Sequence, residues 1–217
     1  MKLLLNKAHY PVTVLGPGTR AGIWTQGCTL ACPGCISRDT WDADQRRTVE
    51  VSTVVDWLAS LPDPLDGVTI SGGEPFEQPD ALGELLDGIA TWRAGLPRPV
   101  DVLAYSGHTL GHLRRHFPEL LRRCDAVITG RYVDRLNDRP PRWRGSSNQH
   151  LTALTELGRE RYAHADDSDE EPAERMQVSV DGERLWMIGI PRRGDMDRLS
   201  QRLETAGVNM REASWRA

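Results

Sequence analysis

Short apolar runs alternate with amphipathic stretches along roughly the first 130 residues of the chain. Four runs have the length and continuity of buried strands, at residues 19–26, 67–71, 100–105 and 126–129. Between them, apolar residues recur at helical spacing and predict three helices, one capped by Ser52, one opening at Pro79 and one over residues 109–117. Continuously apolar strands separated by helices indicate an α/β fold with a parallel sheet covered on both sides. The pattern does not distinguish an open doubly wound sheet from a partial barrel.

The pattern changes after about residue 160. Residues 161–175 are polar and acidic, which is typical of a solvated linker. Two apolar runs around Asp181 and Gly182 then predict a β-hairpin, and a helical stripe follows at Met196, Leu199, Leu203 and Ala206. We therefore expect a core domain over residues 1–160, a linker over 161–175 and a β-β-α appendage over 176–217. The appendage is too small to hold much of a core alone, so we expect it to pack on the core domain or on a partner.

The composition limits the class of protein. The 217 residues carry a formal net charge of −4, so the chain offers no strongly basic face to nucleic acid. No apolar stretch is long enough to span a membrane, and the apolar run at the first residues is too short for a signal peptide. Four cysteines are too few for a disulfide framework in a chain of this length. We therefore expect a cytoplasmic protein in a reducing compartment, with no nucleic-acid or membrane partner.

Three cysteines lie close together directly after the first predicted strand. Cys28, Cys32 and Cys35 have the spacing C-x3-C-x2-C, and Pro33 and Gly34 bend the backbone between the last two. A cubane iron–sulfur cluster is usually held by four thiolates, so three would leave one iron open to a small molecule. A structural zinc site is disfavoured, because it needs a fourth ligand and none lies at zinc-knuckle spacing.

Parallel sheets bind ligands at the carboxyl ends of their strands, so the residues that follow the other predicted strands are candidate ligand contacts. They are Ser71, Gly72, Gly73, Glu74, Tyr105, Ser106 and Arg131. The two glycines leave the strand-end backbone uncovered, which gives a ligand's amino group access to its carbonyl groups. Standing alone, Gly-Gly is as typical of a simple turn, but its place one helix after the cysteine loop favours a ligand site.

These motifs carry a resemblance to a known family. The cysteine loop, followed by Ser-Gly-Gly-Glu-Pro at residues 71–75, resembles the radical S-adenosylmethionine superfamily. Three further blocks, at residues 16–20, 130–133 and 143–149, resemble the activating proteins of anaerobic ribonucleotide reductase, which belong to the glycyl-radical-enzyme activases. The blocks occur in the family's order and cover roughly residues 9–150.

The resemblance implies a partial α/β barrel of about six strands. It implies a 4Fe-4S cluster on the three cysteines, with S-adenosylmethionine held by Pro33, Gly34 and the seven strand-end residues, and no catalytic residue beyond the two cofactors. The implied reaction is reductive cleavage of S-adenosylmethionine to a 5′-deoxyadenosyl radical that installs a glycyl radical on a partner enzyme. The implied electron donor is a low-potential flavodoxin or ferredoxin.

Two other functions stay open. One is a radical enzyme that acts on a small molecule or peptide, and the other is a non-catalytic cluster protein that transfers electrons or acts as a sensor. The appendage, a departure from the minimal family, weakens the assignment of the reductase as the target. We expect Cys124 to be a small core residue rather than a fourth ligand. We expect His108, His112 and His116 to form a solvated helix face rather than a metal site.

Overall fold

The computed structural model describes residues 1–217 except 63, 139, 167–174, 183, 209–212 and 214–217. Its main sheet has seven strands in the order β3-β1-β2-β4-β5-β6-β7. The strands are β1 (Lys2–Val12), β2 (Arg20–Thr25), β3 (Thr48–Glu50), β4 (Gly67–Gly72), β5 (Asp101–Ser106), β6 (Ala126–Thr129) and β7 (His150–Ala153). Strands β2, β4, β5 and β6 are parallel, whereas β1, β3 and β7 run antiparallel to their neighbours. The predicted α/β class and the four predicted strands are confirmed, and β1, β3 and β7 are additions to them.

The helices that connect the strands are α1 (Val51–Ala59), α2 (Pro79–Arg93), α3 (Leu110–His116), α4 (Pro118–Arg122) and α5 (Glu156–Arg161). Helix α2 begins at Pro79 as predicted, and the third predicted helix gives way to α4 at Pro118. The prediction of Ser52 as the cap of α1 is wrong. Glu50 precedes the helix, and the amide of Val51 donates to the carbonyl of Met1. Sheet pairing of β3 with β1 therefore sets where the helix starts.

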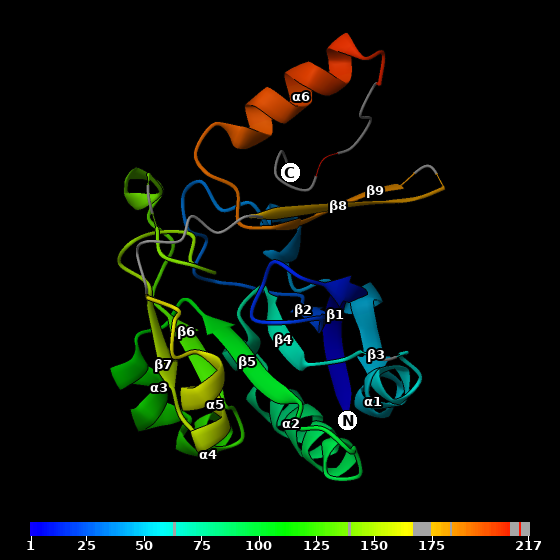
Figure 1. The fold of residues 1–217 in the computed structure, drawn as a ribbon, viewed down its shortest axis with the longest axis vertical. Coiled ribbons are helices and arrows are strands. Elements are labelled where there is room, and N and C mark those ends of the chain that lie inside the picture. Colours follow the sequence, from blue (N-terminus) through cyan, green and yellow to red (C-terminus); the bar gives the residue numbers. More distant parts are fainter. Residues whose placement is uncertain (63, 139, 167–174, 183, 209–212, 214–217) are drawn as a thin grey trace.

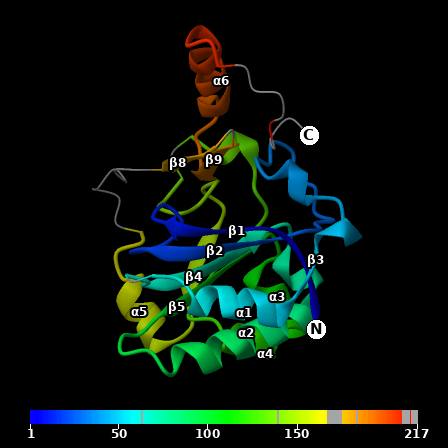
Figure 2. The same ribbon diagram turned by 90° about the vertical axis from the view of Figure 1, so that its right-hand side faces the viewer.

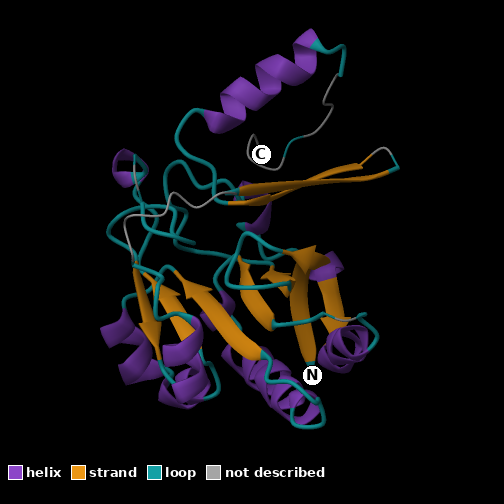
Figure 3. Cartoon of the chain, in the orientation of Figure 1, coloured by secondary structure: helices purple, strands orange, loops and turns teal. Residues whose placement is uncertain are grey.

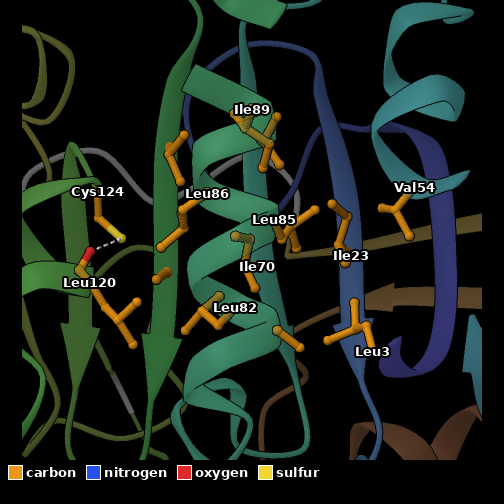
Figure 4. Close-up of a cluster of buried hydrophobic side chains, with 14 of the residues drawn as sticks. Leu3, Ile23, Val54, Ile70, Leu82, Leu85, Leu86, Ile89, Leu120 and Cys124 are labelled. Atoms are coloured by element: carbon orange, nitrogen blue, oxygen red, sulfur yellow. Dashed lines mark hydrogen bonds between the residues drawn. The ribbon is translucent and has the colours of Figure 1, made fainter. Parts of the chain in front are cut away.

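One face of the sheet packs against the helices. Figures 1 and 2 show α1 to α4 on the same side of the sheet. The core between them is aliphatic, with the α2 stripe of Leu82, Leu85, Leu86 and Ile89 against Ile23 and Ile70 (Figure 4). These side chains are at most 1% exposed, so their burial is a main source of the stability of the fold.

The other face of the sheet carries a buried ion pair on its central strands. The Arg20 guanidinium, fully buried, donates to both carboxylate oxygens of Asp101, at 3.0 and 2.8 Å, and to the hydroxyl of Thr69 at 2.7 Å. The Tyr162 hydroxyl also donates to Asp101, at 2.5 Å. A Cβ at Gly67 would collide with the guanidinium. This network occupies the amino-terminal ends of β4 and β5, and the site residues lie at the opposite, carboxyl ends.

The appendage consists of β8 (Met176–Asp181), β9 (Arg184–Gly189) and α6 (Asp195–Thr205), and it packs on the core domain as one of the two expected arrangements (Figure 3). Ile188 is 4% exposed and lies in a cluster with Val12, Val14, Leu15 and Trp24. The Gln177 amide donates to the carbonyl of Pro11 at 2.6 Å, and the rings of Trp186 and His9 stack. The hairpin therefore covers the face of β1 and β2 that the helices leave open.

The domain boundaries stay a prediction. Tyr162 and Ala165 are buried against the sheet, so packed core residues continue to 165. Residues 167–174 of the expected linker lie outside the described residues. On α6, Met196, Leu199 and Leu203 are half-buried. No helix in the described part of the chain is long and apolar enough to cross a membrane.

Candidate active site

The three cysteines lie on a loop between β2 and β3, defined here as the cluster loop, residues 27–41. All three thiols are free and half-buried. Between the cysteines the loop turns twice through left-handed backbone, at Ala31 (φ 43°) and Gly34 (φ 80°), and Gly27 at its start is also at positive φ (103°). The Cys35 amide donates to the Cys32 carbonyl at 3.0 Å. A non-glycine residue at positive φ is uncommon, so Ala31 marks a conformation that the surrounding loop enforces.

Two of the three thiols have N–H donors beside them. Backbone amides of Leu30 and Ala31 bond the Cys28 sulfur, and the Ser37 amide with the Trp41 side chain bonds the Cys35 sulfur. Burial raises the pKa of both thiols above the ordinary value, and these donors partly oppose that rise because they stabilise the thiolates. Thiolate is the form that binds metal, so the donors favour ligation.

The three free thiols on one loop are compatible with a cubane, which takes one thiolate at each of several irons. Among the residues that the structure describes, no three His, Cys, Asp or Glu side chains converge on one point. Cys124 is 1% exposed in the aliphatic core and donates to the Leu120 carbonyl (Figure 4), which confirms it as a core residue. Burial raises its thiol pKa to about 12.

The strand-end glycines bring β4 against the start of the cluster loop. The Gly73 amide donates to the Thr25 carbonyl, and the Glu74 amide donates to the Gly27 carbonyl, both at 2.8 Å. A Cβ at Gly73 would collide with that Gly27 carbonyl, and a Cβ at Gly72 would collide with the Thr25 backbone. The space beside these glycines is therefore filled by the protein's own backbone, which differs from the open space expected from the sequence.

Glu74 joins the ends of β4 and β5. Its carboxylate is 1% exposed and accepts from the Ser106 hydroxyl at 2.9 Å, the Gly107 amide at 2.7 Å and the Phe76 amide at 3.2 Å. Burial raises the Glu74 pKa from 4.5 to about 7, although these donors favour its ionised form. The side chains of Glu74 and Ser106 thus bond each other, and both are positioned at the edge where the cluster loop lies.

Ser71 lies on β4 and pairs with Trp24 of β2. Two further candidates, Tyr105 and Arg131, lie near the ends of β5 and β6. The Tyr105 hydroxyl donates to the Trp143 carbonyl at 2.8 Å, within an apolar cluster on the sheet face opposite the helices. Arg131 is exposed after β6, where the neighbouring Gly130 amide donates to the carbonyls of Ser106 and His108. The ends of β5 and β6 therefore meet. The Tyr105 side chain lies in the apolar cluster, however, whereas that of Arg131 is exposed to solvent.

Several residues that hold the cluster loop were not predicted. The Glu77 carboxylate accepts from the amide and hydroxyl of Thr29, at 3.1 and 2.5 Å. The buried Gln26 amide donates to the carbonyls of Asp39 and Asp42, at 3.0 and 2.6 Å. Leu30 packs where a Cβ at Gly107 would stand. No periodicity marks these polar residues, because their partners lie far along the chain.

Three histidine rings lie in a row, His108 before the start of α3 and His112 and His116 on it. The His108 and His112 rings lie 4.4 Å apart, as do those of His112 and His116. The first pair of rings is stacked and the second is tilted. The expectation of a solvated helix face rather than a metal site stays a prediction.

Comparison with known proteins places this site in a family. A family model described as a 4Fe-4S single cluster domain matches residues 14–152, which include the cluster loop and the strand ends. The anaerobic ribonucleoside-triphosphate reductase-activating protein of Salmonella typhi is 31% identical over 147 residues, covering 65% of this chain and 93% of that protein. The protein of the same name from Enterobacteria phage T4 is 30% identical over 144 residues, covering 66% and 89%.

A second kind of activating enzyme is also similar. The pyruvate formate-lyase-activating enzyme of Staphylococcus aureus (strain USA300) is 33% identical over 145 residues, covering 64% of this chain and 56% of that enzyme. The match to the family model ends before the appendage begins. The chain belongs to the 4Fe-4S single cluster domain family and is a radical S-adenosylmethionine enzyme of the activating type.

Proposed function

We propose that Cys28, Cys32 and Cys35 bind a 4Fe-4S cluster whose fourth iron is left for S-adenosylmethionine. The observation that carries this proposal is the cluster loop itself, with three free, half-buried thiols, left-handed turns between them and N–H donors at two of the sulfurs. When bound and reduced, such a cluster would supply the one electron needed for reductive cleavage of a carbon–sulfur bond of S-adenosylmethionine, with methionine and a 5′-deoxyadenosyl radical as products.

The chain's own residues orient the cofactors. We assign the backbone from Ser71 to Gly73 to the amino group of S-adenosylmethionine, because it ends a parallel strand beside the cluster loop. Pro33 and Gly34 shape the loop between the last two thiols. Glu74 and Ser106 act by holding the ends of β4 and β5 together.

Tyr105 and Arg131 have weaker support as direct contacts. The Tyr105 hydroxyl is already bonded to the Trp143 carbonyl, so we assign it to shaping the wall of the site. Arg131 is exposed beside the meeting point of β5 and β6, where its charge is available to a carboxylate or ribose group.

We further propose that the sheet is a partial barrel of the radical S-adenosylmethionine type. Its four central strands are parallel, helices α1 to α4 lie on one face, and loops and the hairpin lie on the other (Figure 2). Strands β3 and β7 are at opposite ends of the strand order and do not pair, so the described sheet is open. Such an opening gives a protein segment access to the carboxyl ends of the strands.

The proposed substrate is a glycine residue of a partner enzyme, with a low-potential flavodoxin or ferredoxin as electron donor. This rests on the relatives, which are named for activating anaerobic ribonucleotide reductase and pyruvate formate-lyase. A small molecule or peptide is the second candidate substrate, favoured by the appendage beyond the family match.

The test is anaerobic reconstitution with iron and sulfide, reduction, and incubation with S-adenosylmethionine. We expect 5′-deoxyadenosine from the wild-type chain and from Cys124→Ala, and none from Cys32→Ala. A glycyl-radical signal in an added partner enzyme would identify the substrate. Absence of 5′-deoxyadenosine from a fully loaded, reduced chain would support the non-catalytic cluster protein instead.

A further inference from the structure

The appendage contacts the loop that follows β6 through a small polar network. The side-chain amide of Asn137 donates to the Pro191 carbonyl at 3.1 Å and to the Tyr132 hydroxyl at 2.9 Å. That hydroxyl donates to Asp134 Oδ1 at 3.0 Å, and Arg193 Nε lies 3.2 Å from Asp134 Oδ2. We call Tyr132, Asp134, Asn137, Pro191 and Arg193 the bracing network.

The network ends at the cluster loop. A Cβ at Gly34 would stand 3.1 Å from both the Cβ and Oδ1 of Asp134, so the Asp134 side chain lies close against the Gly34 backbone. Gly34 is at positive φ between Cys32 and Cys35. Any movement of Asp134 therefore reaches the turn that presents two of the three thiols.

A second set of hydrogen bonds joins the loop that follows β6 to the base of the hairpin. The Arg175 guanidinium donates to the carbonyls of Ile190, Arg144 and Pro140, at 3.1, 3.3 and 3.4 Å. On the other side of the molecule, Ile188 is buried against β1 and β2. The appendage thus contacts the core domain at two places, the loop after β6 and the face of β1 and β2. Neither of these two contacts involves the cluster loop.

The members of the network differ in importance. Asn137 is 4% exposed, and without its amide the Tyr132 hydroxyl and the Pro191 carbonyl would lose a partner in a buried place. The Arg193–Asp134 pair is largely exposed, with side chains 71% and 36% accessible, so it contributes little alone. Asn137 is therefore the junction between appendage and cluster loop.

We propose that the appendage is a positioning element for the cluster loop, and that it acts through Asn137, Tyr132 and Asp134. The proposal rests on the proposed function in one respect, that the loop holds the cluster. It assigns a role to a segment that the match to the family model does not reach. In this arrangement the residues of the network do not bind the cluster but hold the turn that does.

The first experiment uses the full-length, metal-free chain, so its result does not depend on iron. Hydrogen–deuterium exchange is measured for Asn137→Ala, for Tyr132→Phe, which removes only the hydroxyl, and for Arg198→Ala. Arg198 is the matched control, because it is 61% exposed and pairs with Asp195 inside α6. We expect several-fold faster exchange in residues 27–41 of the first two variants, unchanged exchange in α2, and wild-type behaviour of the control.

The second experiment uses the reconstituted chain. We expect Asn137→Ala and Tyr132→Phe to lose iron to a chelator several-fold faster than wild type and to change the electron paramagnetic resonance line shape of the reduced cluster. If Asn137→Ala does not fold, Tyr132→Phe decides. Wild-type exchange and wild-type iron release in Tyr132→Phe overturn the proposal. A wild-type chain that takes up no iron overturns the proposed function instead, and the exchange result still judges the positioning role.

Discussion

The amide nitrogen of Gly73 and the carbonyl oxygen of Thr25 are joined by a 2.8 Å hydrogen bond, and it holds the end of β4 against the last residue of β2, two positions before the cluster loop begins. Gly73 itself has no room for a Cβ, because the Gly27 carbonyl occupies that position. The glycine pair is thus required for the close approach of the two strand ends, β2 and β4.

Replacing Gly73 should disturb the cluster and the cofactor together. We expect Gly73→Val to lose most of its iron on reconstitution, because the side chain displaces Gly27 and the loop behind it. Iron content and visible absorption measure the effect. Gly111→Ala is the matched control, since a Cβ there meets nothing within 4 Å. Full iron loading in Gly73→Val would contradict this prediction, and the effect of the substitution would then be limited to the binding of S-adenosylmethionine.

The ligand assignment predicts an asymmetry among the four cysteines. Single replacement of Cys28, Cys32 or Cys35 by Ala should abolish the iron–sulfur absorption, because two thiolates do not retain the cubane. Cys124→Ala should keep the cluster and lower the free energy of unfolding by about 1–2 kcal/mol through a small core cavity. Iron analysis and urea unfolding separate the two effects. Iron loss in Cys124→Ala, with the fold intact, would contradict the assignment.

Glu74 should make the stability of the metal-free chain pH-dependent. The pKa of Glu74 is about 7 in the folded chain, against an ordinary value of 4.5 for the unfolded chain. At pH values between these two, the folded chain therefore holds more of this proton than the unfolded chain does. The free energy of unfolding should therefore fall as the pH rises from about 4.5 to about 7, by at most about 1.4 kcal/mol per pH unit, and then level off. Urea unfolding over this range measures it. In Glu74→Gln this component should vanish, and an unchanged slope would rule out Glu74 as its source.

The buried Arg20–Asp101 ion pair, on the sheet face opposite helices α1 to α4, should contribute strongly to the free energy of unfolding. Arg20→Met removes the guanidinium that bonds both oxygens of the buried Asp101 carboxylate and leaves Arg161, whose Nη1 is 3.7 Å from Asp101 Oδ1, as the neighbouring cation. We expect a loss of up to about 3–5 kcal/mol in the free energy of unfolding. Thermal and urea unfolding provide the measurement. The control is Arg46→Ala, whose side chain is 90% exposed beside Asp44 and should have no measurable effect. Equal stability of both variants would mean that other groups compensate for the lost pair.

A chain ending at residue 165 should expose apolar surface. Without Ile188, the side chains of Val12, Val14, Leu15 and Trp24 lose their cover. We expect such a fragment to bind a hydrophobic dye and to aggregate, measured by fluorescence and light scattering against the full chain. A soluble fragment that binds no dye and retains its cluster would show the appendage to be dispensable for the core.

The central strands were predictable because each is a continuous apolar run, and α2 because Pro79 opens a regular stripe. Strand β1 was missed because only Leu3, Asn6 and Val12 are buried along its eleven residues, which is not the alternation of a half-buried strand. Strands β3 and β7 have three and four residues, too few to show a period. Their places follow from pairing with distant segments.

The same distinction applies to the site. The cysteines and glycines form local motifs and were identified from spacing alone. The residues that hold them in place were not, because each depends on a partner far along the chain. Asn137 and Pro191, for example, bond across 54 positions. Tertiary structure, rather than local pattern, determines which polar side chain meets which carbonyl.

The short pairing of β3 has a consequence for how copies of this chain meet. Strand β3 covers only Lys2, Leu3 and Leu4 of β1, so the rest of that long strand is a sheet edge on this side. Such edges invite a strand from another molecule. Here Arg47 donates to the Asn6 carbonyl, Pro11 has no N–H to offer, and Gln177 bonds the Pro11 carbonyl and the Thr13 amide. Side chains from two distant segments thus block edge-to-edge association. Loss of the hairpin would remove Gln177 and leave the Pro11 carbonyl and the Thr13 amide without these hydrogen bonds.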